Sequence, residues 1–295
     1  MDLDDLLRRT SRTFALAIPL LEEPTRREVG IAYLLFRIAD TFEDESRWPK
    51  ELRRACLLEM ADVLEKRRDA KATAAAWMAL PALQDPSCAD LVSQTADVLD
   101  ALDACGEAAS AIVRKHVRRT ALGMADVVES SDEHGELVIT DVEGLKKYCY
   151  IVAGIVGEML TELFVLAAPT LEPVRAKLDG DAGTFGEGLQ LVNILKDAGG
   201  DVTEGRSFLP EGVPLPLLFQ TARADLDRAK VYVRALHDAH APRGTIAFTA
   251  LPVMLAYAAL DAVEAKGSGA KVPREDVMRI YGELDKKLDE GVFPL

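Results

Sequence analysis

The sequence has little of what a nucleic-acid-binding or secreted protein needs. Its 295 residues carry 35 Lys and Arg against 49 Asp and Glu, a net charge of −14, so it lacks the basic surface that binds phosphate backbones. Its four cysteines include no C-x-x-C pair, which argues against a zinc site or a disulfide framework and favours a reducing compartment. The first residues are acidic, with no apolar run, so no signal peptide is expected. We therefore expect a cytoplasmic protein with no nucleic-acid partner.

The sequence also lacks an uncharged apolar run long enough to cross a membrane. Its longest apolar region, residues 151–169, is interrupted by Glu158 and Glu162, so no membrane span is expected. Hydrophobic residues nevertheless make up 49% of the chain, which is enough for a large buried core and argues against disorder.

Segments that alternate between apolar and polar residues, as strands do, are almost absent, and residues 137–140 are too short to anchor a sheet. Good helix formers with helical periodicity dominate instead. They predict helices over residues 2–18, 24–44, 49–68, 71–80, 87–105, 107–129, 141–168, 184–199, 215–239, 243–265 and 273–289. Breaks are expected at 130–135, 179–183, 210–214 and 241–244. Long helices with short connections predict one all-α bundle domain, residues 1–295, around a central cavity.

A polar stripe runs along the predicted helix 24–44. At 100° per residue, Tyr33, Arg37, Asp40 and Asp44 fall within about a quarter-turn of one another. Their neighbours, residues 34, 35, 38 and 39, are apolar. Acidic side chains on an otherwise apolar helix are expected to point into a cavity.

A second stripe contains Gln190, Asn193, Asp197 and Asp201, spaced 3, 4 and 4 residues apart. The pair Gly199 and Gly200 predicts that this helix ends near Asp197, with Asp201 on its unwinding terminus. About one residue in six is acidic, so either stripe alone also fits a solvated helix face. The two together, each with amide or arginine partners, indicate a site for a hard cation, Mg²⁺ above all.

Four motifs in order resemble the squalene/phytoene synthase family of head-to-head isoprenyl transferases. The segment TSRTF at 10–14 is similar to the family's N-terminal segment, and RIADTFED at 37–44 resembles its first aspartate-rich motif. The segment YCYIVAGIVG at 148–157 resembles its central box. The segment QLVNILKDAGGD at 190–201, followed by GRSFLP at 205–210, resembles its second aspartate-rich motif. Two departures are Lys196, where the family commonly has Arg, and Gly200, where it often has Glu.

The resemblance implies an isoprenoid (terpenoid) synthase fold in which the two acidic motifs face each other across a cavity. It also implies roles for individual residues. The implied Mg²⁺ ligands are Asp40, Glu43, Asp44, Asn193, Asp197 and Asp201. The implied contacts to substrate are Thr10, Ser11, Arg12, Thr13, Phe14, Tyr33, Arg37, Val152, Gln190, Lys196 and Tyr257. The implied catalytic residues are Tyr148, Arg37, Asp40, Asp44, Asp197 and Asp201.

The implied chemistry is ionisation of an allylic diphosphate, for which Mg²⁺ inverts the local charge and acts as a Lewis acid. The resulting cation must be kept from water. Residues 145–166 offer an apolar wall, on which Tyr148 and Val152 share a face. Tyr148 is either a cation-stabilising ring or an ordinary core aromatic. Gly154 and Gly157 leave room for the close approach of a helix or a lipid tail.

The expected activity is the condensation of two farnesyl diphosphates through presqualene diphosphate to squalene, with NADPH in the second step. The alternatives are phytoene synthesis from two C20 diphosphates, dehydrosqualene synthesis without reductant, a cyclising terpene synthase, and a non-catalytic helical scaffold. The loop 266–271 is either a nicotinamide-contacting loop, as the resemblance implies, or a plain surface loop. Products this apolar imply peripheral, transient contact with a membrane. Neither the oligomeric state nor the pathway served follows from the sequence.

Overall fold

The computed structural model describes residues 3–11, 14–132, 137–203 and 208–295, with side chains at all of these except residue 15 and residues 200–203. Most of the described residues are helical and none lies in a strand, so the predicted all-α class is confirmed. The chain forms two compact units. The first comprises Met1–Pro19 and Glu23–Glu136, and the second comprises Leu20–Glu22 and Leu137–Leu295. The single-domain interpretation stays a prediction.

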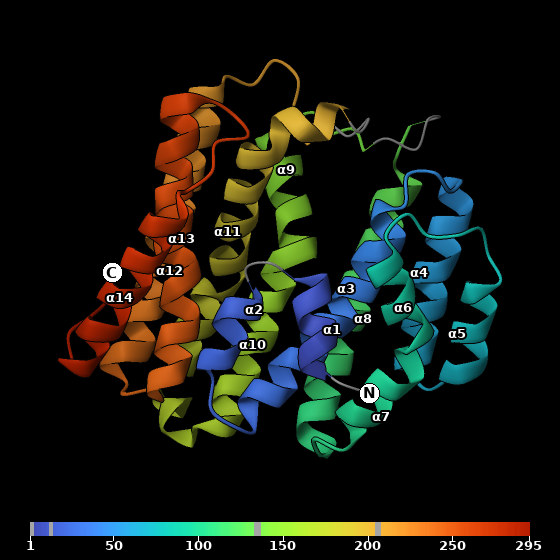
Figure 1. Ribbon diagram of the computed structural model, residues 1–295, viewed down its shortest axis with the longest axis horizontal. Helices are drawn as coiled ribbons and strands as arrows, with labels where there is room; N and C mark the ends of the chain where they lie inside the picture. The colour runs from blue at the N-terminus through green and yellow to red at the C-terminus, as the bar shows by residue number, and fades with distance from the viewer. Residues whose placement is uncertain (1–2, 12–13, 133–136, 204–207) are drawn as a thin grey trace. The chain divides into compact units, whose positions relative to one another are not determined.

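The first unit is built around α3 and α8, which pack against each other and against shorter helices (Figure 1, blue to green). The elements of this unit are α1 Leu3–Thr10, α2 Phe14–Ala17, η1 Ile18–Leu20, α3 Thr25–Asp44, α4 Lys50–Leu64, α5 Ala70–Met78, α6 Pro86–Ser93, α7 Thr95–Asp103 and α8 Glu107–Glu129.

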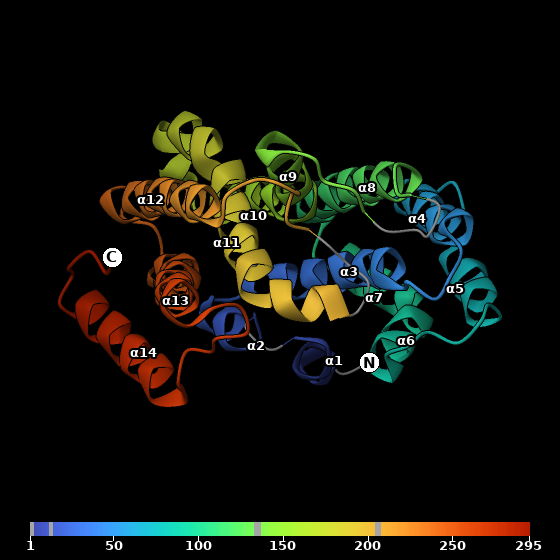
Figure 2. The ribbon, with the colours of Figure 1, turned by 90° about the horizontal axis from the view of Figure 1, so that it is seen from above.

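The second unit is built around α11, which packs along α12 and against α10 and α13 (Figure 2). Its elements are α9 Val142–Cys149, η2 Tyr150–Gly154, α10 Ile155–Ala167, η3 Pro169–Val174, α11 Arg175–Thr203, α12 Leu215–Asp238, α13 Arg243–Lys266 and α14 Arg274–Asp289. The segment η2 is a turn of π-helix inside the otherwise continuous run from α9 to α10.

Most predicted helices are present, and local caps explain where they begin. Helix α3 starts directly after Pro24, and Asp69, Asp85 and Asp141 each accept a hydrogen bond from the first turn of the helix that follows. Two predictions of continuous helices were wrong. Residues 2–18 are divided into α1 and α2, and residues 87–105 are divided into α6 and α7 at Gln94.

The break predicted at residues 179–183 was also wrong, because α11 runs unbroken from Arg175 to Thr203. Its glycines serve packing rather than a turn. A Cβ at Gly186 would overlap the carbonyl oxygen of Ala153, and one at Gly183 would lie 3.3 Å from the Tyr150 ring. The helix likewise continues through Gly199 and Gly200, so the expected unwinding near Asp197 does not occur.

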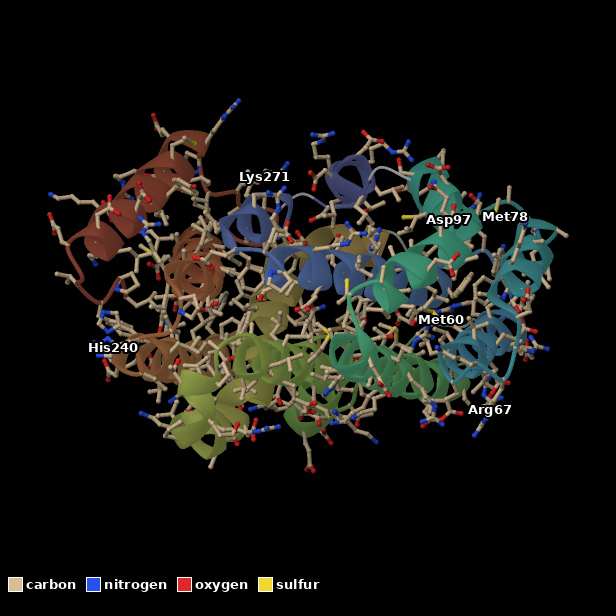
Figure 3. All side chains as sticks on the ribbon, turned by 90° about the horizontal axis from the view of Figure 1, so that it is seen from below. Met60, Arg67, Met78, Asp97, His240 and Lys271 are labelled. Carbon is tan, nitrogen blue, oxygen red and sulfur yellow. The ribbon has the colours of Figure 1, made fainter. Side chains whose placement is uncertain are left out.

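Apolar side chains fill each unit, whereas charged ones project outward. Met60 is buried, while Arg67, Asp97 and Lys271 are exposed (Figure 3). Two helical stretches, Val142–Ala167 and Arg243–Lys266, are long and apolar enough to cross a membrane by length and composition. More than half of the most apolar window of each is buried inside the structure, as in core helices of globular proteins.

Candidate active site

The stripe on α3 has the arrangement predicted from its spacing. Tyr33, Arg37, Asp40 and Asp44 lie between fully buried apolar residues and are themselves only partly buried. The Arg37 Nη1 lies 4.0 Å from the Asp44 Oδ2. The helix therefore carries one polar face in an apolar surrounding, as expected.

Asp40 is the least solvated acid of this stripe. Burial, with a smaller contribution from the Asp44 carboxylate, raises the pKa of its carboxyl to about 7, and the Arg37 guanidinium opposes the shift without cancelling it. The nearby acids hold the pKa of Arg37 above its usual value despite burial. Its Nε atom is buried without a hydrogen-bond partner in the described part of the chain. The stripe thus has a carboxylate that would gain from a further cation and a donor that would gain from an anion.

The N-terminal segment lies against the same stripe. The Tyr33 hydroxyl donates to the carbonyl oxygen of Thr10 at 2.9 Å, and the Phe14 ring lies 5.6 Å from the Tyr33 ring, centroid to centroid. The Ser11 hydroxyl accepts from the backbone N–H of Phe14 at 3.1 Å. The structure therefore brings Thr10, Ser11 and Phe14 together with the first acidic motif. Arg12 and Thr13 lie outside the described residues.

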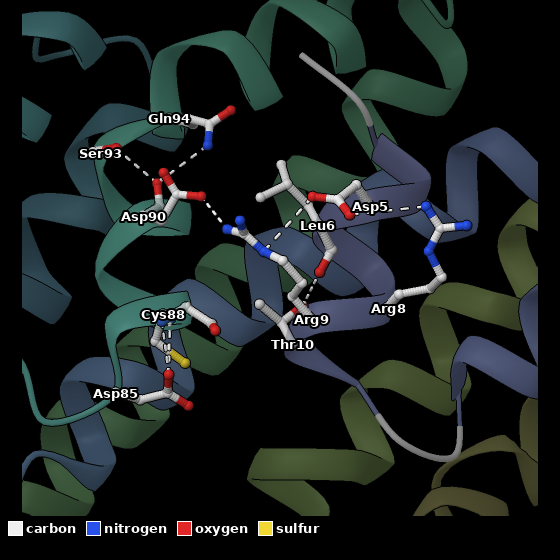
Figure 4. A network of polar contacts seen from close by, with 11 residues as sticks. Asp5, Leu6, Arg8, Arg9, Thr10, Asp85, Cys88, Asp90, Ser93 and Gln94 are labelled. Atoms are coloured by element: carbon white, nitrogen blue, oxygen red, sulfur yellow. Dashed lines mark hydrogen bonds and ion pairs between the residues drawn. The ribbon is translucent and has the colours of Figure 1, made fainter.

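Helix α1 covers the N-terminal half of the α3 stripe. Leu7 lies where a Cβ at Gly30 would be only 3.2 Å away, and Asp4 pairs with Arg26 at 3.3 Å. Arg9 pairs with Asp90 on α6, which ties α1 to that helix as well (Figure 4). Because Arg37, Asp40 and Asp44 lie further along α3, beyond the Thr10–Tyr33 contact, α1 ends beside the acidic half of the stripe.

Two residues near Arg37 were missed by the sequence reading. Cys88 is buried, which raises the pKa of its thiol, while the Arg37 charge opposes that shift. The Asp85 carboxylate caps α6 by accepting from the N–H of Ser87 at 2.7 Å (Figure 4). Hydrogen bonds from the backbone N–H groups of Ser87 and Cys88, together with the Arg37 charge, outweigh the effect of burial and lower the pKa of Asp85. No pattern in residues 85–88 signals this placement, since it depends on how α6 packs on α3.

Glu43 differs from the two aspartates around it. It is 7% exposed and lies about 60° from Asp40 around the helix axis, on the side away from Asp44. Its carbonyl oxygen accepts from the buried Arg53. No group of three or more His, Cys, Asp or Glu side chains in the described ranges is placed to hold a metal ion by itself. A ligand role for Glu43 stays a prediction.

The second stripe lies near the C-terminal end of α11, in the other unit. Asn193 and Asp197 are exposed, and Gln190 is half-buried. The Lys196 ammonium lies 3.3 Å from both the Asn193 Oδ1 and the Asp197 Oδ2. Asp201 belongs to the same helix, and its side chain lies outside the described part of the structure. Lys196 therefore supplies positive charge at the position where a diphosphate contact was predicted.

The loop after α13 closes against this stripe. The backbone N–H of Gly269 donates to the Lys196 carbonyl oxygen at 2.7 Å. A Cβ at Gly199 would lie 2.6 Å from the Ser268 hydroxyl oxygen, which explains a glycine inside a helix. The loop 266–271, with exposed Lys266 and Lys271, is thus fastened to the second acidic motif.

The central box forms a wall of the second unit. Tyr148 is buried, and its ring stacks on Phe208 with 5.1 Å between centroids. Phe208 was not singled out from the sequence. Directly after α9 comes η2, and π-helical turns of this kind occur often at functional sites. Val152 lies in η2 and is half-buried.

The two glycines of the box serve a helix rather than a lipid tail. A Cβ at Gly157 would overlap the Ala182 carbonyl oxygen, and one at Gly154 would lie 3.1 Å from the Gly183 carbonyl oxygen. The backbones of η2 and α10 therefore lie directly against α11, about one to two turns before Gln190.

Tyr257 is not joined to the α11 stripe by any contact that the structure gives it. Its hydroxyl bonds to the exposed Asp227 Oδ1 on α12 at 2.6 Å, and burial together with that carboxylate raises its pKa. It lies in a polar seam between α12 and α13 with Arg223, which pairs with Asp261. Its predicted contact with substrate stays a prediction.

Comparisons with known proteins agree with these motifs. The squalene/phytoene synthase family model matches residues 7–213. Squalene synthase ERG9 of Candida albicans is 29% identical over 209 residues, which are 71% of this chain and 45% of the relative. The Botryococcus squalene synthase of Botryococcus braunii is 29% identical over 199 residues, 68% of this chain and 39% of the relative. The match thus spans less than half the length of these curated relatives.

Solved structures share the fold. TcSQS in complex with the ligand BPH1237 is 25% identical, with 96% of this chain and 85% of that chain covered and a TM-score of 0.75. A dehydrosqualene synthase in complex with a ligand is 20% identical, with 98% and 95% covered and a TM-score of 0.62, and supports the fold alone. The predicted isoprenoid synthase fold is thereby confirmed, and the chain belongs to the squalene/phytoene synthase family.

Proposed function

We propose that this protein is a prenyltransferase that joins two allylic prenyl diphosphates head to head, and that its substrates are two molecules of farnesyl diphosphate. The observation that carries this proposal is the α3 stripe: a half-buried carboxylate with a pKa of about 7 beside a guanidinium whose Nε has no hydrogen-bond partner among the described residues. Family membership and the second polar stripe on α11 support it.

The residues of each stripe fit Mg²⁺ and diphosphate together. Asp40 and Asp44 offer carboxylate oxygens from one helix face, and Asn193 and Asp197 offer oxygen ligands from another, with Asp201 as a further predicted ligand outside the described side chains. Oxygen ligands are the donors that Mg²⁺ prefers. Bound there, Mg²⁺ supplies Lewis-acid stabilisation of the diphosphate as it leaves. Glu43 is the weakest candidate of the predicted set because its residue is only 7% exposed.

The side chains of the stripes act mainly on the leaving diphosphate. Arg37 and Lys196 donate charge-assisted hydrogen bonds to its oxygens, with Arg12 as a further predicted donor. Tyr33 holds the Thr10 carbonyl and so keeps the N-terminal segment, with Ser11, beside the stripe. Tyr148 presents its ring to positive charge and excludes water from it together with Val152. Stacking on Phe208 holds that ring in place.

The reaction that we propose has two stages. Two farnesyl diphosphates give presqualene diphosphate with loss of one diphosphate and one proton. Loss of the second diphosphate, with hydride from NADPH, then gives squalene. The loop 266–271 supports NADPH use because it is basic and fastened to Lys196 at the second stripe. Proton loss without reductant would give dehydrosqualene instead.

Product mass tests the proposal directly. The purified protein is incubated with Mg²⁺ and either the C15 or the C20 diphosphate, with and without NADPH. Squalene formed only from the C15 substrate with NADPH is the expected result. Phytoene from the C20 substrate, or dehydrosqualene without reductant, would reassign the substrate or the second stage. No consumption of either substrate would overturn the proposal.

A non-catalytic scaffold and a cyclising terpene synthase are distinguished by two further readouts. Asp40→Asn and Asp197→Asn are expected to lower turnover by at least about a hundredfold while the protein stays folded, because each removes a predicted metal ligand. If the protein is a non-catalytic scaffold, the wild type itself shows no turnover. A cyclising enzyme would consume one diphosphate per product and give a C15 cyclic hydrocarbon. We also propose cytoplasmic location with transient membrane contact, because the product is insoluble in water.

A further inference from the structure

The start of α12 exposes an uncharged apolar surface, which we call the α12 tip, residues 213–217. Pro214, Leu215, Pro216 and Leu217 are all exposed, with Leu215 at 49% and Leu217 at 45%. No residue from Gly212 to Ala222 is charged, although more than a quarter of the chain is. Five consecutive apolar residues at a helix end, with no neighbour covering them in the described structure, are unusual on a water-facing surface.

The backbone of the α12 tip is as poor in polar groups as its side chains. Pro214 and Pro216 have no N–H group. The N–H groups of Leu217 and Leu218 both bond to the carbonyl oxygen of Pro214, at 2.9 and 3.4 Å. A helix normally leaves its first four N–H groups in need of water or a cap. In the α12 tip most of these N–H groups are either absent or hydrogen-bonded, which suits a surface that moves from water into an apolar phase.

The α12 tip is level with the second polar stripe of the same unit. Helices α11 and α12 run antiparallel, since Asp181 pairs with Arg228 at 2.5 Å and Gly188 lies against Asp225. From that last contact, ten residues back along α12 reach Leu215, and nine residues forward along α11 reach Asp197. Figure 1 shows the start of α12 and the end of α11 at one end of this unit.

We propose that the α12 tip docks on the surface of a lipid bilayer and that Leu215 and Leu217 enter its interfacial region. This proposal rests on the proposed function, because the hydrocarbon product is insoluble in water and partitions into membranes. A bilayer is favoured over a polar partner because the side chains of the α12 tip offer no hydrogen bonds and its backbone has few free N–H donors for such a partner. The net charge of −14 disfavours attraction to anionic lipid. The expected target is therefore a zwitterionic membrane, held by apolar contact that salt does not weaken.

Flotation of the full chain with phosphatidylcholine vesicles tests the proposal. Wild type is expected to float with the vesicles equally at low and high salt. The double variant Leu215→Glu with Leu217→Glu is expected to lower the vesicle partition coefficient by at least about tenfold, because each leucine contributes apolar burial. Glutamate in the first turn suits the helix dipole, so the variant is expected to keep the wild-type circular dichroism and melting temperature. The matched control is Met278→Glu, which charges an apolar residue that is 61% exposed on α14.

Several outcomes would overturn the proposal. They are wild type that stays with the soluble fraction, a double variant that floats like wild type, and a Met278→Glu variant that loses binding equally. Concentration-dependent dimers that the double variant abolishes, without vesicle binding, would assign the α12 tip to a second copy instead. Turnover of C15 diphosphate in detergent is measured in parallel. Flotation without turnover would support docking and contradict the proposed enzymatic function. Turnover without flotation would support the enzymatic function and contradict docking.

Discussion

Asp40 shows that a functional carboxylate can be recognised by the folding stability that is lost when it ionises. Its pKa is about 7 in the folded protein, against a usual value of 3.8. Between these values the folded protein holds a proton that the unfolded chain releases, so stability falls as pH rises from about 4 to about 7 and stays reduced above. A nearby cation would remove this penalty, which is why the burial of Asp40 beside Asp44 fits a metal or substrate site.

Replacing Asp40 therefore has opposite expected effects on stability and on turnover. Without divalent cations, Asp40→Asn is expected to melt a few degrees above wild type near pH 8, because it removes an ionised, poorly solvated group. Near pH 4, where wild-type Asp40 is protonated, the two proteins are expected to melt together. Differential scanning calorimetry across this range measures both. The control is Asp97→Asn, an exposed acid on α7. An Asp40→Asn protein that is never more stable than wild type would contradict this account.

At the scale of single residues, the sequence predicted the features that depend on residue spacing along one helix. It missed the contacts that depend on how the helices pack. One face for Tyr33, Arg37, Asp40 and Asp44 follows from helical geometry alone, and the structure agrees. The approach of Cys88 and Asp85 to Arg37, and of Phe208 to Tyr148, joins residues far apart in the chain. No local pattern signals such contacts.

Among the helices, α11 shows why a glycine-rich segment was misread. Residues 179–183 were predicted as a break because glycine lowers helix propensity. Gly186 instead faces the backbone of η2 and Gly183 faces the Tyr150 ring, and the polar stripe continues along the same face to Gln190 and Asp197. The free energy gained from close helix packing outweighs the low helix propensity of glycine. This gain cannot be read from the sequence of α11 alone, because it depends on the segment packed against it.

The glycines of α11 allow a matched test of that explanation. A Cβ at Gly186 would overlap backbone atoms of Ala153 and Gly154, whereas one at Gly180 would meet no atom within 4 Å. Gly186→Ala is expected to destabilise the protein by about 1–3 kcal/mol through overpacking. Gly180→Ala is expected to stabilise it by up to about 1 kcal/mol through helix propensity. Urea unfolding measures both, and equal effects would contradict the packing explanation.

Helices α9, α11 and α12 are joined by a buried ionic cluster that the sequence did not reveal. Lys146 lies 3.0 Å from the Asp225 Oδ1 and 3.4 Å from the Glu187 Oε2. Both carboxylates are largely buried, and burial raises the pKa of Glu187 despite the Lys146 charge. The Asp225 Oδ2 is buried without a hydrogen-bond partner in the described structure. Lys146 is therefore the main neutralising charge for two acids.

Removing that charge is expected to destabilise the second unit. Lys146→Met leaves both carboxylates unpaired and is expected to cost about 1–3 kcal/mol, less than for a fully buried pair because Lys146 is partly exposed. The loss should be smaller near pH 5 than near pH 8, since Glu187, whose pKa is already raised, then protonates more readily. Adding Glu187→Gln and Asp225→Asn should recover stability. Urea titrations at both pH values check this, and a pH-independent loss would refute it.

For the whole molecule, the all-α class was available from helical periodicity, and the family relationship was available from the order of four motifs. The motifs lie in two units, with Asp40 in the first and Asp197 in the second. Whether both act on one diphosphate is therefore a question for energetics. If one bound Mg²⁺–diphosphate cluster needs both, losing either should remove the whole of its binding energy, and losing the second should remove nothing more.

Inorganic diphosphate with Mg²⁺ serves as the probe. Saturating probe is expected to raise the wild-type melting temperature by several degrees, since ligand at a hundred times its Kd contributes about 2.7 kcal/mol. Asp40→Asn and Asp197→Asn should each abolish the shift relative to the same variant without probe, and the double variant should equal either single one. Asp97→Asn should keep the full shift. Two half-sized, additive losses would instead mean that each stripe binds its own ion and would contradict this prediction.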